Sequence, residues 1–99
     1  MGYPSDFAKA LRQARKARGL TQEDFSDTSS RTYVSMLERG VRSPTIAKIN
    51  ELCETLEIQP LTLLTLTYCV SHRAADLRRL LSDVERELSQ LLESELRRG

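Results

Sequence analysis

The chain has 99 residues, of which 39% are hydrophobic and 29% charged, with only four glycines and three prolines. This composition is typical of one soluble globular domain, and it excludes a fibrous, disordered or multi-domain protein. The longest apolar run, residues 61–70, is about half of the roughly 20 residues in a membrane-spanning helix, and no leader or lipidation signal is visible, so the expected compartment is the cytoplasm.

Charge is unevenly distributed along the chain, although the net charge is only +1. Residues 1–43 carry eight basic groups against five acidic ones, residues 44–71 carry one against three, and residues 72–99 carry six against six. A positive first part followed by a neutral last part predicts that only the first part of the chain faces a polyanion.

The first two helices are predicted from an apolar stripe and a capping residue. Three apolar residues recur at helical spacing within residues 5–18: Phe7, Leu11 and Ala14. Gly19 suits the end of this helix, and Thr21 caps a short second one. The Ser- and Thr-rich cluster at residues 26–30 then breaks the chain and caps a third helix.

The third helix, roughly residues 31–39, is predicted to have two different faces. Val34 and Leu37 form its buried edge, while basic and polar side chains cover most of the remaining surface. Gly40 ends the helix. This is the predicted helix whose outer face best suits a negatively charged partner.

Two more helices complete the predicted domain. Thr45 caps the fourth, whose apolar residues again follow the helical period: Ile46, Ile49, Cys53 and Leu56. Pro60 suits the first turn of the fifth helix. Residues 61–68 alternate leucine and threonine as a strand would, but no partner strand is evident elsewhere, so we expect a helix.

An enzyme is the least favoured class of function. Cys53 and Cys69 are isolated thiols with only His72 as a further ligand, which is too few for a structural zinc, so we expect buried cysteines and no metal. No glycine-rich phosphate loop and no Cys-His-Asp arrangement is present, so no nucleophile or general base is evident. We expect no cofactor, and we interpret His72 as the polar start of the last helix.

The last 28 residues predict a long amphipathic helix whose apolar residues are separated by alternating steps of four and three. The stripe consists of Leu77, Leu81, Val84, Leu88 and Leu91, widened by Leu80, Leu92 and Leu96. A helix of about 40 Å is too long to be covered by the rest of the chain. We expect part of the stripe to pack on another copy or on a partner protein; folding back onto its own domain is the alternative.

Two short helices joined by a polar turn, the second with a basic and polar face, suit the major groove of a DNA duplex. Three segments in order resemble the XRE, or Cro-like phage-repressor, family of helix-turn-helix proteins: Gly19-Leu20-Thr21-Gln22-Glu23-Asp24-Phe25-Ser26, Arg31-Thr32-Tyr33-Val34-Ser35-Met36-Leu37-Glu38-Arg39-Gly40 and Ser43-Pro44-Thr45. The resemblance runs from about Leu11 to Leu64. It implies an all-α protein with a five-helix phage-repressor-like DNA-binding domain over residues 4–70, followed by the amphipathic oligomerisation helix over residues 71–99.

The resemblance also assigns roles to individual residues. Positions that reach base edges in the family match Arg31, Thr32, Ser35 and Met36. Positions that contact the sugar-phosphate backbone match Thr21, Gln22, Tyr33, Arg39, Arg42 and Ser43, with entry of Arg42 into the minor groove as an alternative. Arg15 and Glu38 match a structural ion pair between the first and third helices.

One departure from the family pattern concerns the turn before the third helix. The family usually has a glycine and a longer connection there, whereas this chain has only residues 27–30 between Ser26 and Arg31. We therefore expect a shorter second helix or a tighter turn than usual.

The function that the resemblance implies is regulation of transcription. We expect a sequence-specific protein that binds double-stranded DNA as a dimer or higher oligomer on an inverted-repeat operator, associated with the nucleoid of a bacterium or with a phage. The alternative is a helical protein-interaction module, such as an antitoxin-like protein, whose long last helix grips another protein.

Overall fold

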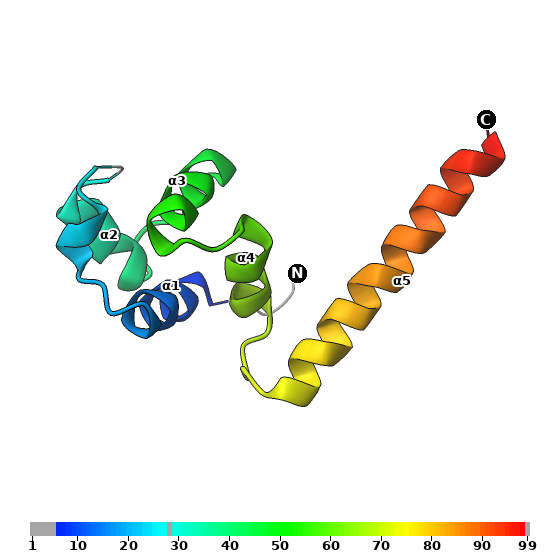
Figure 1. Ribbon diagram of the computed structural model, residues 1–99, viewed down its shortest axis with the longest axis horizontal. Coiled ribbons are helices and arrows are strands. Elements are labelled where there is room, and N and C mark those ends of the chain that lie inside the picture. Colours follow the sequence, from blue (N-terminus) through cyan, green and yellow to red (C-terminus); the bar gives the residue numbers. More distant parts are fainter. Residues whose placement is uncertain (1–5, 28, 99) are drawn as a thin grey trace.

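The computed structural model describes residues 6–27 and 29–98, and this part of the chain contains helices and no strands (Figure 1). The elements in order are α1 (Phe7–Ala17), the 3-10 turn η1 (Gln22–Phe25), α2 (Arg31–Glu38), α3 (Ile46–Leu56), α4 (Pro60–Tyr68) and α5 (Ala74–Arg98). The elements from α1 to α4 form a rounded body, and α5 extends from one end of it. The predicted all-α fold is confirmed.

Local signals in the sequence explain where the helices begin and end. The side-chain oxygens of Asp6, Ser30 and Thr45 each accept a backbone N–H from the first turn of α1, α2 and α3. Gly19 and Gly40 follow α1 and α2 with φ angles of 70° and 74°, a left-handed conformation in which other residues are strained.

The second helix is reduced to the single 3-10 turn η1. The amide of Thr21 donates to the Asp24 carboxylate at 2.6 Å, and this bond closes the turn. The amide of Ser29 donates back to the carbonyl of Phe25 at 2.8 Å. The short connection to α2 is therefore accommodated by removing helical turns from the second element, as the missing glycine and shortened spacing indicated.

One apolar core joins α1 to α4. Its completely buried large side chains come from all five elements of the body: Leu11, Phe25, Val34, Leu37, Leu52, Leu56 and Leu63. Burial of such side chains stabilises the fold by about 1.5–3 kcal/mol each. Ile46 follows the same helical period as Ile49, Cys53 and Leu56 but lies outside this core, since it is the first residue of α3 and is 78% exposed. Leu52, which is outside that series, is completely buried.

The two cysteines are free and buried, as predicted. Burial raises the pKa of the Cys53 thiol. The ambiguous leucine and threonine segment is the helix α4, with Pro60 in its first turn. Among the described residues, no helix is both long and apolar enough to cross a lipid bilayer.

His72 fastens the linker between α4 and α5 to the body. Its backbone has a φ of 56°, and α5 begins two residues later, so the prediction that His72 starts the last helix was wrong. The ring Nδ1 lies 2.6 Å from the side-chain oxygen of Gln13 in α1, and Nε2 lies 2.9 Å from the carbonyl of Leu66 in α4. Because a carbonyl oxygen can only accept, Nε2 is the donor.

The second half of α5 is not covered by the described part of its own chain. Three of its leucines are more than half exposed: Leu88, Leu91 and Leu92. Within the described residues α5 packs against α4, and Figure 1 shows the helix leading away from the body. The alternative in which this helix folds back over its own domain is therefore not observed.

Candidate nucleic-acid interface

α2 has an apolar inner face and a polar outer face. Val34 and Leu37 are completely buried against the core. The four side chains predicted to meet bases are exposed or half-buried: Arg31, Thr32, Ser35 and Met36. Figure 1 shows α2 and α5 at opposite ends of the molecule, so α5 does not cover this outer face.

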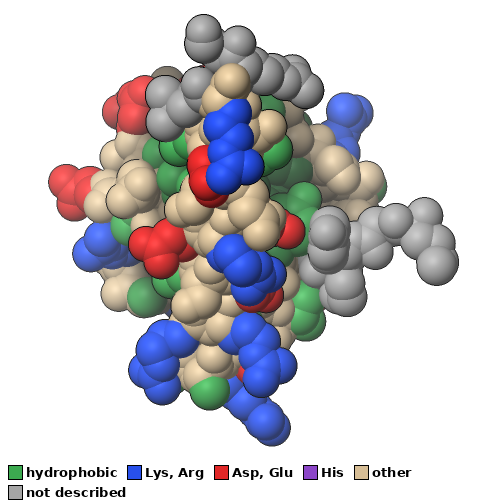
Figure 2. Space-filling view, turned by 90° about the vertical axis from the view of Figure 1, so that its right-hand side faces the viewer, with side chains coloured by type: hydrophobic (Ala, Val, Ile, Leu, Met, Phe, Trp, Pro, Cys, Tyr) green, Lys and Arg blue, Asp and Glu red, His purple; other side chains and the backbone are tan. Residues whose placement is uncertain are grey.

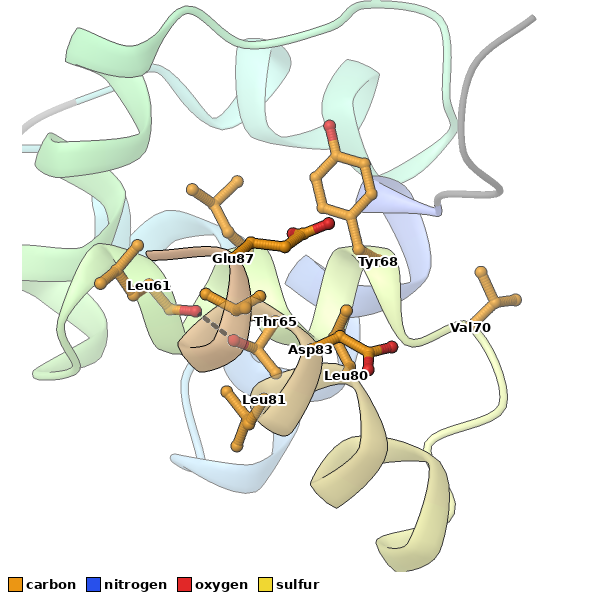
Figure 3. Close-up of a pocket in the computed structure, with 10 residues that line it drawn as sticks. Leu61, Thr65, Tyr68, Val70, Leu80, Leu81, Asp83 and Glu87 are labelled. Atoms are coloured by element: carbon orange, nitrogen blue, oxygen red, sulfur yellow. Dashed lines mark hydrogen bonds between the residues drawn. The ribbon is translucent and has the colours of Figure 1, made fainter. Parts of the chain in front are cut away.

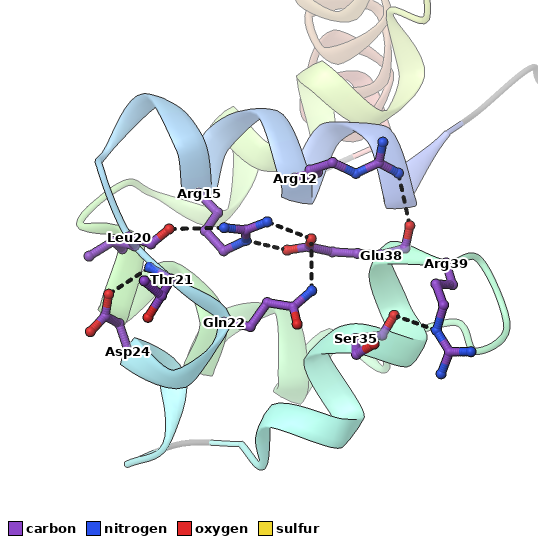
Figure 4. A network of polar contacts seen from close by, with 9 residues as sticks. All are labelled: Arg12, Arg15, Leu20, Thr21, Gln22, Asp24, Ser35, Glu38 and Arg39. Atoms are coloured by element: carbon purple, nitrogen blue, oxygen red, sulfur yellow. Dashed lines mark hydrogen bonds and ion pairs between the residues drawn. The ribbon is translucent and has the colours of Figure 1, made fainter.

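A buried ion pair joins the end of α2 to α1 (Figure 4). Arg15 Nε donates to Glu38 Oε2 at 2.7 Å, and Arg15 Nη2 donates to Glu38 Oε1 at 2.9 Å. The third nitrogen, Nη1, donates to the carbonyl of Leu20 at 2.9 Å. The Glu38 side chain is only 5% exposed. This pair therefore links α1, the loop before η1 and α2 at one point.

Two further side chains complete this polar network. In η1, Gln22 Nε2 donates to Glu38 Oε1 at 3.2 Å. From α1, Arg12 Nη2 donates to the backbone carbonyl of Glu38 at 3.0 Å. The last carbonyls of a helix have no partner within the helix, so Arg12 satisfies one of them at the end of α2. The network holds α2 in one orientation relative to α1 and η1.

The electrostatics of the network favour the charged form of Glu38. Burial disfavours the carboxylate and by itself raises its pKa, but the hydrogen bonds from Arg15 and Gln22 and the charges of Arg15 and Arg12 outweigh this effect. The pKa of Glu38 therefore lies below its ordinary value of 4.5. The hydrogen bond to Glu38 in turn raises the pKa of Arg15.

Comparison with known proteins identifies this arrangement. The family model described as "Helix-turn-helix" matches residues 11–63, which is more than half of the chain. The chain belongs to the XRE-type helix-turn-helix family. The predicted resemblance is confirmed, and α5 lies outside the residues that the family model matches.

Two similar proteins agree with this assignment. A Sinorhizobium fredii protein described as an uncharacterized HTH-type transcriptional regulator, y4dJ, is 40% identical over 65 residues, which cover 64% of this chain and 79% of the relative. The crystal structure of the restriction-modification controller protein C.AhdI from Aeromonas hydrophila is 36% identical, with a TM-score of 0.56, and the match covers 60% of this chain and 92% of that chain.

Part of the positive charge of the helix-turn-helix domain is used internally. Arg18 donates from Nε to the carbonyl of Leu56 at 2.9 Å and from Nη2 to the carbonyl of Glu57 at 3.1 Å, at the end of α3. Four other basic residues in positions 1–43 also donate to acceptors in the protein, so at least five of the eight do so: Lys9, Arg12, Arg15, Arg18 and Arg39. Charge counting overstated the surface facing a polyanion, because a helix C-terminus attracts cations as well.

Thr21 and Gln22, which were predicted to contact phosphates, both have partners within the helix-turn-helix domain. The backbone N–H of Thr21 donates to the Asp24 carboxylate, so this N–H is not available to an anion. Gln22 donates to Glu38, which places it against the end of α2. In this position Gln22 braces the helix-turn-helix unit.

The other predicted phosphate-contact residues lie on or beside α2. Arg39, Arg42 and Ser43 are exposed, and Arg39 Nε donates back to a carbonyl of α2 at 3.4 Å. Tyr33 is half-buried, and the Lys48 ammonium of α3 lies 5.3 Å from its ring centroid. Lys48 was missed in the sequence, where it is a single cation in an acidic segment and its distance to Tyr33 is not visible.

An acidic residue of η1 lies beside Arg31, the first residue of α2 and one of the four predicted to contact bases. The Glu23 carboxylate of η1 lies 3.7 Å from Arg31 Nη1, and both side chains are more than two-thirds exposed. Exposed ion pairs contribute little free energy, roughly 0–1 kcal/mol. Glu23 therefore does little to hold Arg31 back from an acceptor on DNA.

Proposed function

We propose that the chain is a sequence-specific regulator of transcription that binds double-stranded DNA as a dimer on an inverted repeat. The observation that carries this proposal is the exposed face of α2, held in one orientation by the buried network around Glu38. Each copy places α2 in the major groove of one half-site, and the half-sites lie about 34 Å apart, one turn of the duplex.

Base recognition comes from four side chains of α2. Arg31 makes two hydrogen bonds to a guanine, and the methyl groups of Thr32 and Met36 meet thymine methyls. Ser35 reaches a base edge or a phosphate. Support for Arg31 comes from its place at the start of α2, where its side chain is 68% exposed and pairs with the similarly exposed Glu23.

Phosphate contacts on both sides of α2 set its register on the duplex without reading sequence. They come from Thr21, Gln22, Tyr33, Arg39, Arg42 and Ser43. The exposure of Arg39, Arg42 and Ser43 after the end of α2 supports this assignment. For Arg42 the minor groove is the alternative, because the residue lies in the loop after α2.

A dimer is required because one α2 helix meets too few base pairs for useful selectivity. The second copy attaches through the apolar stripe of α5, at Leu77, Leu81, Val84, Leu88 and Leu91. All but Leu77 are more than two-fifths exposed in the single chain. α5 lies far from α2, so pairing at α5 leaves both reading surfaces accessible.

The test is selection of bound duplexes from a random pool at two salt concentrations, followed by anisotropy titrations on the selected sequence. We expect an enriched sequence with two-fold symmetry, and a logarithmic affinity slope of about −0.9 for each phosphate neutralised. Enrichment of a single asymmetric half-site would contradict the inverted repeat, and no enrichment at either salt concentration would contradict sequence-specific binding.

The uncovered stripe on α5 favours one other candidate function, a protein-interaction module in which α5 grips a different protein. The same salt series separates the two functions. Contact through a leucine face barely responds to salt, whereas binding to phosphates weakens steeply.

A further inference from the structure

A groove of about 560 Å³ lies between α4 and the first half of α5 (Figure 3). Its apolar walls are Leu61, Leu64 and Tyr68 of α4 and Leu80, Leu81 and Val84 of α5. The groove lies at the opposite end of the body from α2, so it is separate from the surface proposed to bind DNA.

The α4 wall of the groove is unusually apolar for an exposed surface. α4 carries leucines around most of its circumference, and a helix of this kind is normally buried on all sides. Leu63 is completely buried in the core, whereas Leu61 on the outer side is 66% exposed. The outer side of α4 is therefore exposed although its residues are as apolar as those of a buried helix.

The uncovered apolar surface is large enough for a stable dimer. It is made by α4 and the α5 stripe together, from Leu61, Tyr68, Leu81, Val84, Leu88, Leu91 and Leu92. The exposed parts of these side chains amount to on the order of 700 Å², near the roughly 800 Å² that each partner contributes to a standard interface. A soluble monomer typically has a largest apolar patch of about 300–600 Å².

The spacing of the α5 stripe matches a second copy of the same helix running in the opposite direction. The apolar positions from Leu80 to Leu92 are 80, 81, 84, 88, 91 and 92, so the steps between them are one, three, four, three and one. This series reads the same in both directions. In an antiparallel two-fold pair, residue i of one copy faces residue j of the other and residue j faces residue i, so this series places apolar positions opposite one another from Leu80 to Leu92.

We propose that α5 of a second copy lies antiparallel in the groove between α4 and α5. This inference rests on the proposed dimer and adds its register. Leu91 of the second copy lies against Leu81 of the first, and Leu88 of the second copy lies against Val84 of the first. The second half of one α5 thereby covers the α4 wall of the other copy, and the two-fold axis crosses the apolar stripe between Val84 and Leu88.

The outward side of α5 is consistent with this arrangement. Seen from the side that α5 occupies, the molecule shows basic and acidic side chains in front and apolar side chains beside and behind them (Figure 2). Arg86 pairs with Asp83 at 3.0 Å, and Arg97 pairs with Glu93 at 2.7 Å. Arg86, Glu93 and Arg97 do not line the groove, whereas the carboxylate-bearing residues Asp83 and Glu87 line it beside the apolar side chains.

The register is tested by mixing two full-length variants, Leu81→Cys and Leu91→Cys, under mild oxidation. Each variant carries one new cysteine. Antiparallel pairing brings the two new thiols to disulfide distance, a Cβ separation of about 3.8 Å. We expect a linked dimer in the mixture at least about fivefold more abundant than with either variant alone. The unmodified chain, whose two cysteines are buried, is the control.

Two results would overturn the register without touching the dimer itself. Strong linkage of Leu81→Cys alone would show parallel helices. A dimer mass by light scattering without any linkage in the mixture would place the second α5 elsewhere. A monomer mass at concentrations where the chain binds two half-sites would instead remove the proposed dimer together with the inference.

The α4 wall is tested separately with a matched pair of neighbouring variants. Leu61→Glu puts a charge into the groove, while Thr62→Glu puts the same charge on an exposed position of α4 that does not line it. We expect Leu61→Glu to raise the dimer dissociation constant at least about tenfold and Thr62→Glu to leave it unchanged. Equal dissociation constants would show that α5 pairs without the groove.

Discussion

Arg15 in α1 binds Glu38 at the end of α2 through two hydrogen bonds of 2.7 and 2.9 Å, and both side chains are largely buried. The pair joins residues 23 positions apart. Because Glu38 also accepts from Gln22, its carboxylate is the point at which α1, η1 and α2 are held together.

Replacing Glu38 with alanine should lower the free energy of unfolding by about 3–5 kcal/mol, because the buried Arg15 guanidinium loses its partner. Urea denaturation followed by circular dichroism measures this change. Glu93→Ala is the matched control, since it breaks an ion pair of the same 2.7 Å length on the surface of α5 and should cost less than about 1 kcal/mol. Equal costs for the two variants would contradict the role of burial.

Glu38 also predicts a pH dependence with a definite sign. Its pKa in the folded chain lies below the ordinary value of 4.5, so the stabilisation is fully present above that value and is lost as the pH falls through the lower, folded-state pKa. The stability advantage of the natural chain over Glu38→Gln should therefore shrink below about pH 4.5. Denaturation curves at a series of pH values measure it; an advantage that stays constant down to about pH 3 would exclude a contribution from the charge.

Arg31→Ala should weaken binding to the preferred operator by about 1–3 kcal/mol and relax preference at one base pair. Anisotropy titrations on the operator and its single-base variants measure both effects. Arg97→Ala removes the same charge from a similarly exposed position, 77% against 68%, at the far end of α5, and should leave base preference unchanged. Equal weakening on every sequence would assign Arg31 to the phosphates.

Truncation after Arg73 should reduce the mass measured by light scattering to that of a monomer. It removes α5 and retains His72, whose bonds to α1 and α4 belong to the body. The truncated chain should lose most of its affinity for two half-sites while keeping that for one half-site, because α2 is unaffected. An unchanged mass would place the self-association surface in the body.

Most helix boundaries could be predicted because they depend on residues near in sequence. Gly19 and Gly40 end α1 and α2, and Thr45 and Pro60 begin α3 and α4, as the sequence indicates. The burial of Val34 and Leu37 followed from helical periodicity alone. Ile46 differed because periodicity describes a helix face and not whether neighbouring elements reach its first residue.

The contacts that position the candidate site depend on groups far apart in sequence. Arg12 and Arg18 bind carbonyls 26 and 38 residues away, and such bonds follow from how helices pack. Their sequence signal is identical to that of a surface arginine. The pairing of Arg15 with Glu38 was expected only through the family resemblance. The contacts of Arg31 and its neighbours with DNA stay predictions.

The linker at residues 69–73 has a mechanical consequence for operator choice. His72 pins this linker to α1 and α4, so the direction in which α5 leaves the body is set before the helix begins. In an antiparallel pair the distance between the outer faces of the two α2 helices then depends on two things. They are the direction in which α5 leaves the body and the length of α5 up to the two-fold axis. Extra helical turns added at the C-terminal end of α5 would leave the distance between the two α2 helices unchanged. One residue inserted beside His72 would instead rotate both α2 helices away from the orientation that suits two half-sites one duplex turn apart.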